Sequence, residues 1–198
     1  MFTALLDTSV LWPSLQRDVL LSMAAEGLYR PIWSTAVLQE LTWAEEAKRV
    51  RRGATPKKAH AAAEWLVTQM TQAFDDSCVQ GWEPLVGSYG LPDPDDEHLV
   101  AAAVVGGAGV IVSSNLKDLP EDRLPEGIGA VSAARFAADT VSVSPGFALR
   151  ALENIAQRYQ NPARTVRELV ATLEARYDMT DAATLLVAAL EREEDRHG

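Results

Sequence analysis

The sequence has few of the residues that build disulfides and zinc sites. Its 198 residues include one cysteine, Cys78, which excludes an intramolecular disulfide. The three histidines, His60, His98 and His197, are scattered, so we expect no zinc site built from cysteine and histidine. A metal ion in this protein would therefore depend on oxygen ligands.

Long apolar runs are also missing. No stretch approaches the roughly 20 apolar residues that span a membrane, and Asp7 falls within MFTALLDTSV, where a signal peptide would be apolar. We therefore expect a cytoplasmic protein without a membrane segment. The 47% of apolar and 23% of charged residues are typical of a globular chain, and 198 residues suit one main domain.

Basic residues are scarce overall but concentrated in one place. Lysine and arginine number 18 against 28 acids, and the net charge of −10 by itself argues against a nucleic-acid partner. Residues 47–60 nevertheless hold six basic residues and no acid, which leaves −16 for the rest of the chain. This segment is either a solvated helix end or a track for nucleic-acid phosphates. The residues predicted to contact such phosphates are Arg51, Arg52, Lys57 and Lys58.

Strand and helix patterns alternate over about the first 140 residues. Strands are predicted at TALLD (3–7), SCVQGW around Cys78, GVIVSS (109–114) and the start of AVSAARFAAD. Apolar spacing predicts one helix over 9–26 and a second that starts after a cap at Ser34 or Thr35 and carries Trp43 on its apolar face. Two more helices are predicted, one through Trp65 and Met70 and one over EHLVAAAVVGGA. Strands separated by helices predict an α/β fold with a central, mainly parallel sheet covered by helices on both faces.

The character of the sequence changes near residue 141. SVSPG is rich in turn residues, and apolar side chains then recur at helical spacing over about 148–159, 166–173 and 180–191. Thr165 and Glu168 have the spacing of a capping box at the start of one of these helices. We therefore predict a domain over residues 1–140 and an all-α extension over 141–198 that packs on it.

Carboxylates follow the predicted strands. Asp7 ends the first strand, Asp118 follows the GVIVSS strand, and Asp93, Asp95 and Asp96 lie in the turn before the Ala-rich helix. Ligands of open parallel sheets bind beyond the carboxyl ends of the strands, so we expect these acids to be neighbours in space.

Glu40 adds an acid within the otherwise apolar helix segment QELTW. Burying it without a partner would cost several kcal/mol, so a cluster containing it needs a cation. Oxygen ligands select a hard ion such as Mg²⁺ or Mn²⁺, and carboxylate clusters holding such ions hydrolyse phosphodiesters.

Each of these acids also has an ordinary structural interpretation. Asp7 and Asp96 could cap the helices that follow them, and Glu40 could be a surface residue. Asp93 and Asp95 flank prolines in a turn, and Asp118 could be a loop acid. His98 is most simply read as a helix residue.

The order of these motifs resembles a known family. LLDTSVLWP, LPDPDDEHLVAAAVVGGAGVIVSSNLKDLP and the RYQNPARTVRELVATLEA tail are similar to PIN-domain ribonucleases, in particular VapC-type toxins with a helical C-terminal extension. The resemblance implies a PIN-like three-layer α/β/α fold. It places the catalytic acids of the family on Asp7, Glu40, Asp96 and Asp118, with Asp93 competing with Asp96 as a metal ligand. Supporting polar residues fall on Ser9, Asn115 and Ser113, the last at a position where threonine is common.

The function that the resemblance implies agrees with the carboxylate chemistry. It is a Mg²⁺- or Mn²⁺-dependent endoribonuclease that leaves a 5′-phosphate and a 3′-hydroxyl on structured RNA such as tRNA or rRNA. A small antitoxin would silence it, and a homodimer is expected. Without metal, at least one of the crowded acids should retain its proton.

Two other classes stay open. One is a degenerate PIN-like domain that binds RNA or protein without cleavage. The other is a haloacid-dehalogenase-like phosphatase, which would need a second aspartate where Ser9 stands.

Overall fold

The computed structural model describes residues 2–197 and divides into two compact units. One unit, here called the sheet unit, consists of Phe2–Trp12 and Pro31–Ala130. The other, the helical unit, consists of Pro13–Arg30 and the chain from Val131 onward. The domain boundary predicted at residue 140 stays a prediction.

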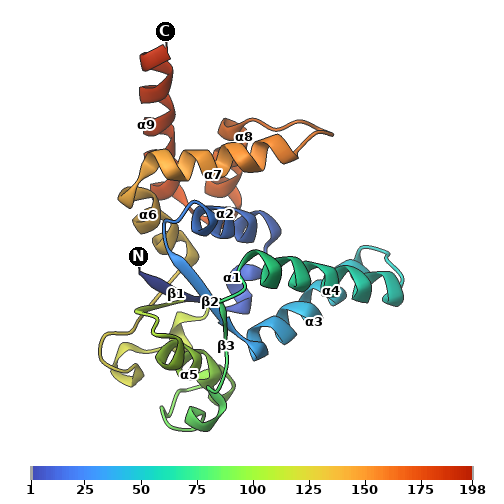
Figure 1. The fold of residues 1–198 in the computed structure, drawn as a ribbon, viewed down its shortest axis with the longest axis vertical. Helices are drawn as coiled ribbons and strands as arrows, with labels where there is room; N and C mark the ends of the chain where they lie inside the picture. Colours follow the sequence, from blue (N-terminus) through green and yellow to red (C-terminus); the bar gives the residue numbers. More distant parts are fainter. Residues whose placement is uncertain (1, 198) are drawn as a thin grey trace. The chain divides into compact units, whose positions relative to one another are not determined.

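The sheet unit is built on a five-stranded parallel sheet with the strand order β3-β2-β1-β4-β5 (Figure 1). The strands are β1 (Thr3–Leu6), β2 (Arg30–Ser34), β3 (Cys78–Val79), β4 (Val110–Val112) and β5 (Gly129–Val131). Leu6 of β1 lies opposite Val112 of β4, so the residues that follow these two strands emerge side by side. This register places Asp7 beside Ser113 at the carboxyl edge of the sheet.

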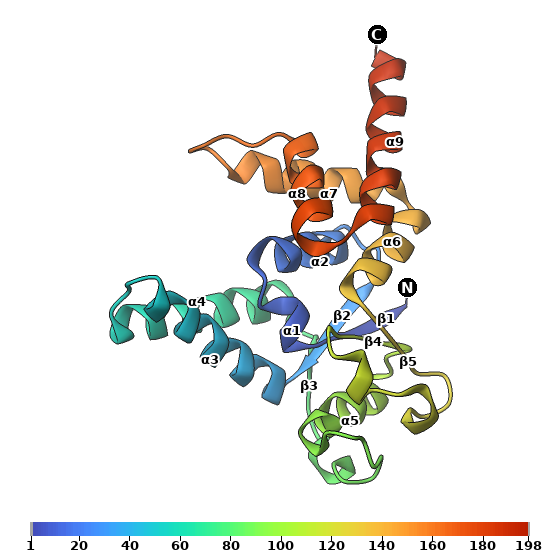
Figure 2. The same cartoon turned by 180° about the vertical axis from the view of Figure 1, so that it is seen from behind.

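Four α-helices belong to the sheet unit: α1 (Thr8–Leu11), α3 (Thr35–Arg51), α4 (Pro56–Ala73) and α5 (Glu97–Gly106). Short 3-10 turns lie at η1 (Glu83–Leu85), η2 (Pro94–Asp96), η3 (Leu116–Asp118) and η4 (Glu121–Arg123). Helices α3 and α4 run side by side, and α5 packs against β1 and β4 (Figures 1 and 2). A Cβ on Gly106 would clash with Cδ1 of Ile32 on β2 and with Cγ2 of Val79 on β3, so a larger residue there would force these side chains to shift.

The helical unit contains α2 (Ser14–Ala25), α6 (Ala133–Val143), α7 (Pro145–Arg158), α8 (Val166–Tyr177) and α9 (Thr180–His197). Helix α7 packs against α2, α8 and α9, and α6 packs against α9. The predicted apolar faces form the core of this unit, because Leu152, Ile155 and Leu173 are buried. The predicted capping box of Thr165 and Glu168 is confirmed.

The fold class predicted from the sequence is confirmed, since the sheet is parallel and the C-terminal part is helical. The single helix predicted over 9–26 is wrong. The chain breaks into α1 and α2 at Pro13, which has extended backbone angles and no N–H to continue a helical ladder.

The sequence analysis also missed β2, in which Pro31 weakens the strand signal. Trp43 and Trp65 were placed on apolar helix faces, but they are 60% and 63% exposed. The apolar spacing of α3 and α4 is therefore not a guide to which of their large side chains are buried.

Candidate functional site

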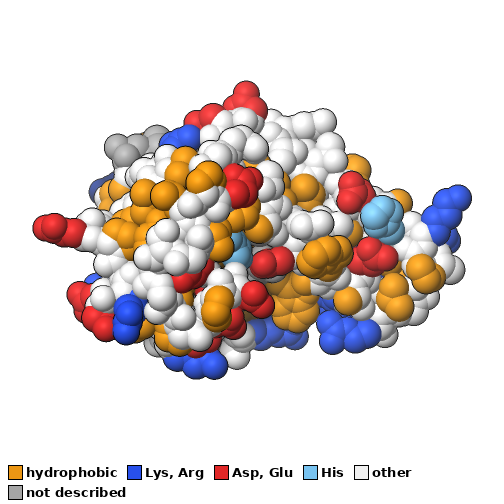
Figure 3. Space-filling view, turned by 90° about the horizontal axis from the view of Figure 1, so that it is seen from below, with side chains coloured by type: hydrophobic (Ala, Val, Ile, Leu, Met, Phe, Trp, Pro, Cys, Tyr) orange, Lys and Arg blue, Asp and Glu red, His pale blue; other side chains and the backbone are white. Residues whose placement is uncertain are grey.

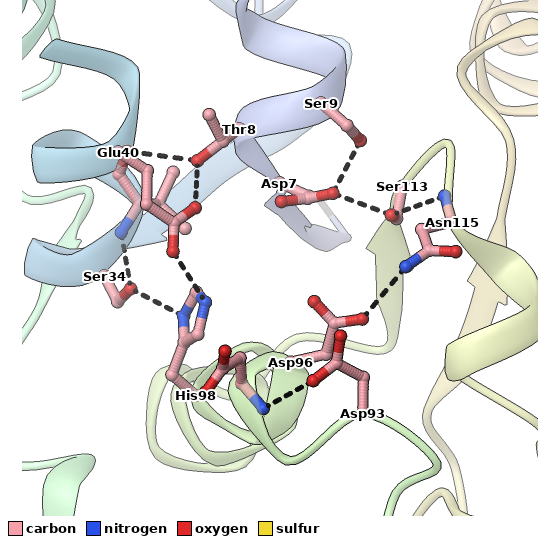
Figure 4. A network of polar contacts seen from close by, with 12 residues as sticks. Asp7, Thr8, Ser9, Ser34, Glu40, Asp93, Asp96, His98, Ser113 and Asn115 are labelled. Atoms are coloured by element: carbon pink, nitrogen blue, oxygen red, sulfur yellow. Dashed lines mark hydrogen bonds and ion pairs between the residues drawn. The ribbon is translucent and has the colours of Figure 1, made fainter. Parts of the chain in front are cut away.

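Asp7 is held at the carboxyl edge of the sheet by two serines. Its Oδ2 atom accepts hydrogen bonds from Ser9 Oγ at 2.6 Å and from Ser113 Oγ at 2.7 Å. Its backbone N–H donates to the carbonyl of Val112 at 3.0 Å, which continues the β1–β4 pairing. Although Asp7 precedes α1, its side chain makes no capping hydrogen bond, so the helix-cap interpretation of Asp7 is wrong. The carboxylate is buried and faces the other acids (Figure 4).

Three further aspartates converge from two loops. Carboxylate oxygens of Asp93, Asp96 and Asp118, one from each residue, lie within 4.8 Å of one another. Asn115 joins two of them, because its Nδ2 donates to Asp118 Oδ2 at 2.6 Å and to Asp96 Oδ2 at 3.2 Å. The loop before α5 and the loop after β4 therefore meet in one acidic cluster, here defined as Asp93, Asp96 and Asp118.

The cluster changes the acidity of Asp96. Burial, together with the negative charges of Asp7, Asp93 and Asp118, raises the pKa of Asp96 from 3.8 to about 6. This confirms that one of the crowded acids retains its proton at a pH where an isolated aspartate would not. A cation placed among these oxygens would relieve the repulsion, and the three carboxylates could hold one.

The structural interpretations of the loop acids are only partly correct. Asp96 stands at the N-cap position of α5, but its side chain makes no capping hydrogen bond. Asp93 does form the expected turn, since its Oδ1 accepts from the backbone N–H of Asp95 at 3.0 Å. Asp95 itself is exposed and lies outside the cluster. Asp93 therefore both shapes the loop and contributes to the cluster.

Glu40 lies on α3, outside this cluster, and has protein partners of its own. Its Oε2 accepts from Thr8 Oγ1 at 2.7 Å, and its Oε1 lies 3.3 Å from His98 Nε2. The hydrogen bond from His98 is the main cause that lowers the pKa of Glu40 below its usual value. The argument that Glu40 is buried and needs a cation is therefore wrong, because its side chain is 40% exposed and already paired.

His98 and Ser34 are site residues that the sequence analysis did not find. Ser34 was assigned only as a helix cap, and His98 only as a helix residue. The cap is confirmed, since Ser34 Oγ accepts from the backbone N–H of Val37, and the same oxygen lies 3.4 Å from His98 Nδ1. The sequence feature that could have identified His98 as a site residue is its position, two residues after Asp96 in the first turn of an Ala-rich, buried helix.

The loop that leads to the cluster is anchored by Glu97. This side chain is buried, and its carboxylate accepts hydrogen bonds from four loop amides. The donors are the backbone N–H groups of Gly87, Tyr89, Gly90 and Leu91. Although burial opposes ionisation, these donors lower the pKa of Glu97 below its usual value. Glu97 therefore fixes the segment from which Asp93 and Asp96 are presented.

The predicted RNA-contacting residues lie together at one end of the α3–α4 pair. Arg51 and Arg52 close α3, Lys57 and Lys58 open α4, and all four are exposed. Figure 3 shows basic side chains toward this end of the molecule. We call these four residues the basic track.

Two of the six basic residues in this segment have acidic partners instead. Lys48 is buried, pairs with Glu45 and donates to the carbonyl of Trp12 at 3.4 Å. Arg49 Nε donates to the other oxygen of Glu45 at 2.9 Å. The bond from Lys48 to Trp12 ties α3 to the end of α1, and both Lys48 and Arg49 are engaged within the protein.

Comparison with known proteins bears on the helical unit. Residues 134–188, which run from α6 into α9, match the family model described as the VapC50 C-terminal domain. The parallel sheet with its acidic cluster fits a PIN domain. The matched segment supports a relationship to the VapC-type family. No curated protein and no solved structure was found to match the chain.

This match over the helical unit agrees with the resemblance to VapC-type toxins seen in the sequence. Within residues 2–197, no helix has the length and apolar character needed to cross a bilayer.

Proposed function

We propose that this VapC-type protein is a metal-dependent endoribonuclease. The observation that carries the proposal is the convergence of carboxylate oxygens from Asp93, Asp96 and Asp118 within 4.8 Å, with Asp7 near enough to raise the pKa of Asp96. All the donors are oxygens and no cysteine or histidine belongs to the cluster, which suits Mg²⁺ or Mn²⁺.

The proposed roles follow the position of each side chain. Asp7, Asp96 and Asp118 hold the ion together with Asp93, and Glu40 completes the catalytic set from the side of α3. Three neutral residues orient these acids. Ser9 and Ser113 hold Asp7, and Asn115 holds Asp96 and Asp118.

The reaction is hydrolysis of an RNA phosphodiester. When bound, a divalent cation supplies the charge that polarises the phosphate and makes a neighbouring water more acidic. The water oxygen joins phosphorus as the bond from phosphorus to the 3′ oxygen breaks, which leaves a 5′-phosphate and a 3′-hydroxyl. One proton stays on the new phosphate and the other ends on the released 3′ oxygen. Glu40, whose pKa is low, stays ionised and can accept a hydrogen bond from such a water.

The basic track gives RNA a path to an otherwise acidic protein. A phosphate backbone that approaches a chain of net charge −10 meets a repulsive potential. The track residues are exposed on α3 and α4, and α3 also carries Glu40. We therefore assign Arg51, Arg52, Lys57 and Lys58 to RNA phosphates.

Other features of the proposal come from the family. We propose that the substrate is a structured RNA such as tRNA or rRNA, that a small cognate antitoxin silences the enzyme, and that the toxin forms a homodimer. Residues 1–140 would be the nuclease domain and residues 141–198 its helical extension. These points are tested by purifying the chain with its neighbouring gene product and by mapping the RNA ends it produces.

The central test compares two adjacent aspartates. Purified protein is incubated with total RNA in Mg²⁺, in Mn²⁺ or in EDTA, and cleavage is followed by gel and by end mapping. We expect cleavage only with metal, and a loss of at least about 100-fold in Asp96→Asn, since removing a ligand should cost no less than removing its supporting partner. Asp95→Asn is the matched control, because Asp95 is exposed and outside the cluster. Metal-dependent RNA binding without cleavage in the wild type would instead support a degenerate binding domain.

A further inference from the structure

His98 is a buried side chain in the first turn of α5 with polar partners on both ring nitrogens. Its Nε2 lies 3.3 Å from Glu40 Oε1, and its Nδ1 lies 3.4 Å from Ser34 Oγ. The Trp82 ring packs beside the imidazole, with 6.0 Å between the ring centroids. The imidazole is therefore restrained by its two polar partners, which Figure 4 shows, and by the Trp82 ring.

The hydrogen bonds around His98 have a consistent direction. An ionised Glu40 carboxylate can only accept, so Nε2 carries the ring proton and donates it to Glu40. In the neutral imidazole Nδ1 is then an acceptor, and the Ser34 hydroxyl, which itself accepts from the backbone N–H of Val37 at 3.1 Å, can donate to it. The chain of donors runs from the start of α3 through Ser34 and His98 to the Glu40 carboxylate.

The second oxygen of Glu40 is held from another element. Thr8 Oγ1, in the first turn of α1, donates to Glu40 Oε2 at 2.7 Å. Each carboxylate oxygen keeps a further lone pair for a water, so these bonds orient Glu40 without occupying it fully. In Figure 4 the Glu40 carboxylate faces the same open area as the carboxylates of Asp7 and Asp96.

We propose that His98 is a positioning residue that orients the Glu40 carboxylate relative to the acidic cluster. His98 and Asp96 are two residues apart at the start of α5, so the segment that presents a cluster aspartate also directs Glu40. His98 acts through Glu40 and does not touch the cluster ion. This inference rests on the proposed nuclease function, and it adds a residue and a role to that site.

The test uses two substitutions that each keep one half of the imidazole contacts. In His98→Gln the side-chain amide can reach the position of Nε2 and donate to Glu40, whereas in His98→Asn it can reach only toward Ser34. Mn²⁺ affinity is measured on the full chain by calorimetry, without RNA, and kcat and KM are measured with RNA. Since removing an outer partner of a metal site costs about 10–100-fold in affinity or activity, we expect that loss in His98→Asn and most of it restored in His98→Gln.

A double-mutant cycle separates positioning from packing. If His98 acts through Glu40, His98→Asn has no further effect on Mn²⁺ affinity or on kcat in a Glu40→Gln background. His60→Asn is the matched control, because His60 forms a similar pair with Glu46, 3.2 Å apart, on the exposed surface of α4. The control should retain the Mn²⁺ affinity of the wild type.

The outcomes distinguish the inference from the proposed function. Equal Mn²⁺ affinity and kcat in the wild type and His98→Asn, or equal losses in the Gln and Asn variants, would overturn the role of His98 while leaving the nuclease intact. Additive losses in the cycle would also overturn it. A wild type that neither binds Mn²⁺ nor cleaves RNA would refute the proposed function, and the positioning role with it. Melting curves of both variants identify loss of fold.

Discussion

Replacing Asp96 by asparagine should stabilise the metal-free protein while it removes activity. Burial of the Asp96 carboxyl, together with the charges of three neighbouring carboxylates, raises its pKa from 3.8 to about 6. Asparagine has nearly the same shape and keeps an oxygen to accept the hydrogen bond from Asn115. The substitution therefore removes a repelled charge without opening a cavity.

The expected gain follows from the pKa of Asp96. A pKa that rises from 3.8 to about 6 corresponds to ~3 kcal/mol of destabilisation once the carboxyl is ionised in the folded protein. Solvent screens part of this cost because Asp96 is only partly buried, so we expect the variant to gain ~1–2 kcal/mol.

The stability gained by Asp96→Asn should depend on pH in a defined direction. Because the folded-state pKa is raised, the stability that protonated Asp96 contributes is fully present below pH 3.8, where it is protonated in both states, and is lost progressively as the pH rises through 6. The advantage of Asp96→Asn should therefore be largest above pH 6 and shrink toward pH 4.

Guanidinium unfolding in EDTA at several pH values between 4 and 8 measures this difference. Adding Mg²⁺ or Mn²⁺ should stabilise the wild type more than the variant, because binding to the folded state adds free energy only where the site is intact. The exposed neighbour Asp95 serves as the control. Asp95→Asn should change neither the free energy of unfolding in EDTA nor the stabilisation by added metal. An Asp96→Asn protein that is less stable than the wild type at pH 7.5, or a gain that does not vary with pH, would refute the reasoning.

Two other variants test the RNA path and the loop before the acidic cluster. Alanine at all four basic-track positions should weaken RNA binding and flatten the slope of log affinity against log salt by about three, at ~0.7 per contact with single strands. Alanine at exposed Arg176 on α8 should leave the slope unchanged, and a wild-type slope in the fourfold variant would show that RNA enters elsewhere. Glu97→Gln should lower the melting temperature at neutral pH, because one oxygen that accepts loop N–H groups becomes a donor. Since the pKa of Glu97 is lowered on folding, its stabilisation is present above pH 4.5 and lost as the pH falls, so the two melting temperatures should converge in acid.

Local sequence patterns predicted the framework of the site. The apolar run before Asp7, the strand before Ser113 and the turn before the Ala-rich helix could each be recognised within about ten residues. Parallel strands present their carboxyl ends at one edge, so the rule that such ends meet was enough to expect the aspartates together. The caps at Thr165 and Ser34 were also predictable from local sequence, because a cap depends on residues three or four positions apart.

The partners of individual side chains were decided by the tertiary structure. Ser34 and His98 are 64 positions apart, and no local spacing connects them or joins His98 to Glu40. Lys48 looked like a surface cation within a basic run, but folding places it against Glu45 and the end of α1. Trp43 had the spacing of a core residue and is exposed.

The sequence by itself therefore determined the fold class, the family resemblance and the oxygen chemistry of the site, because strand ends, caps and acid spacing are local properties. The tertiary structure alone decided which acids share one cluster, which are paired elsewhere and which basic side chains stay exposed. Those outcomes depend on contacts between residues far apart in the chain, and on how much water each charge retains once they meet.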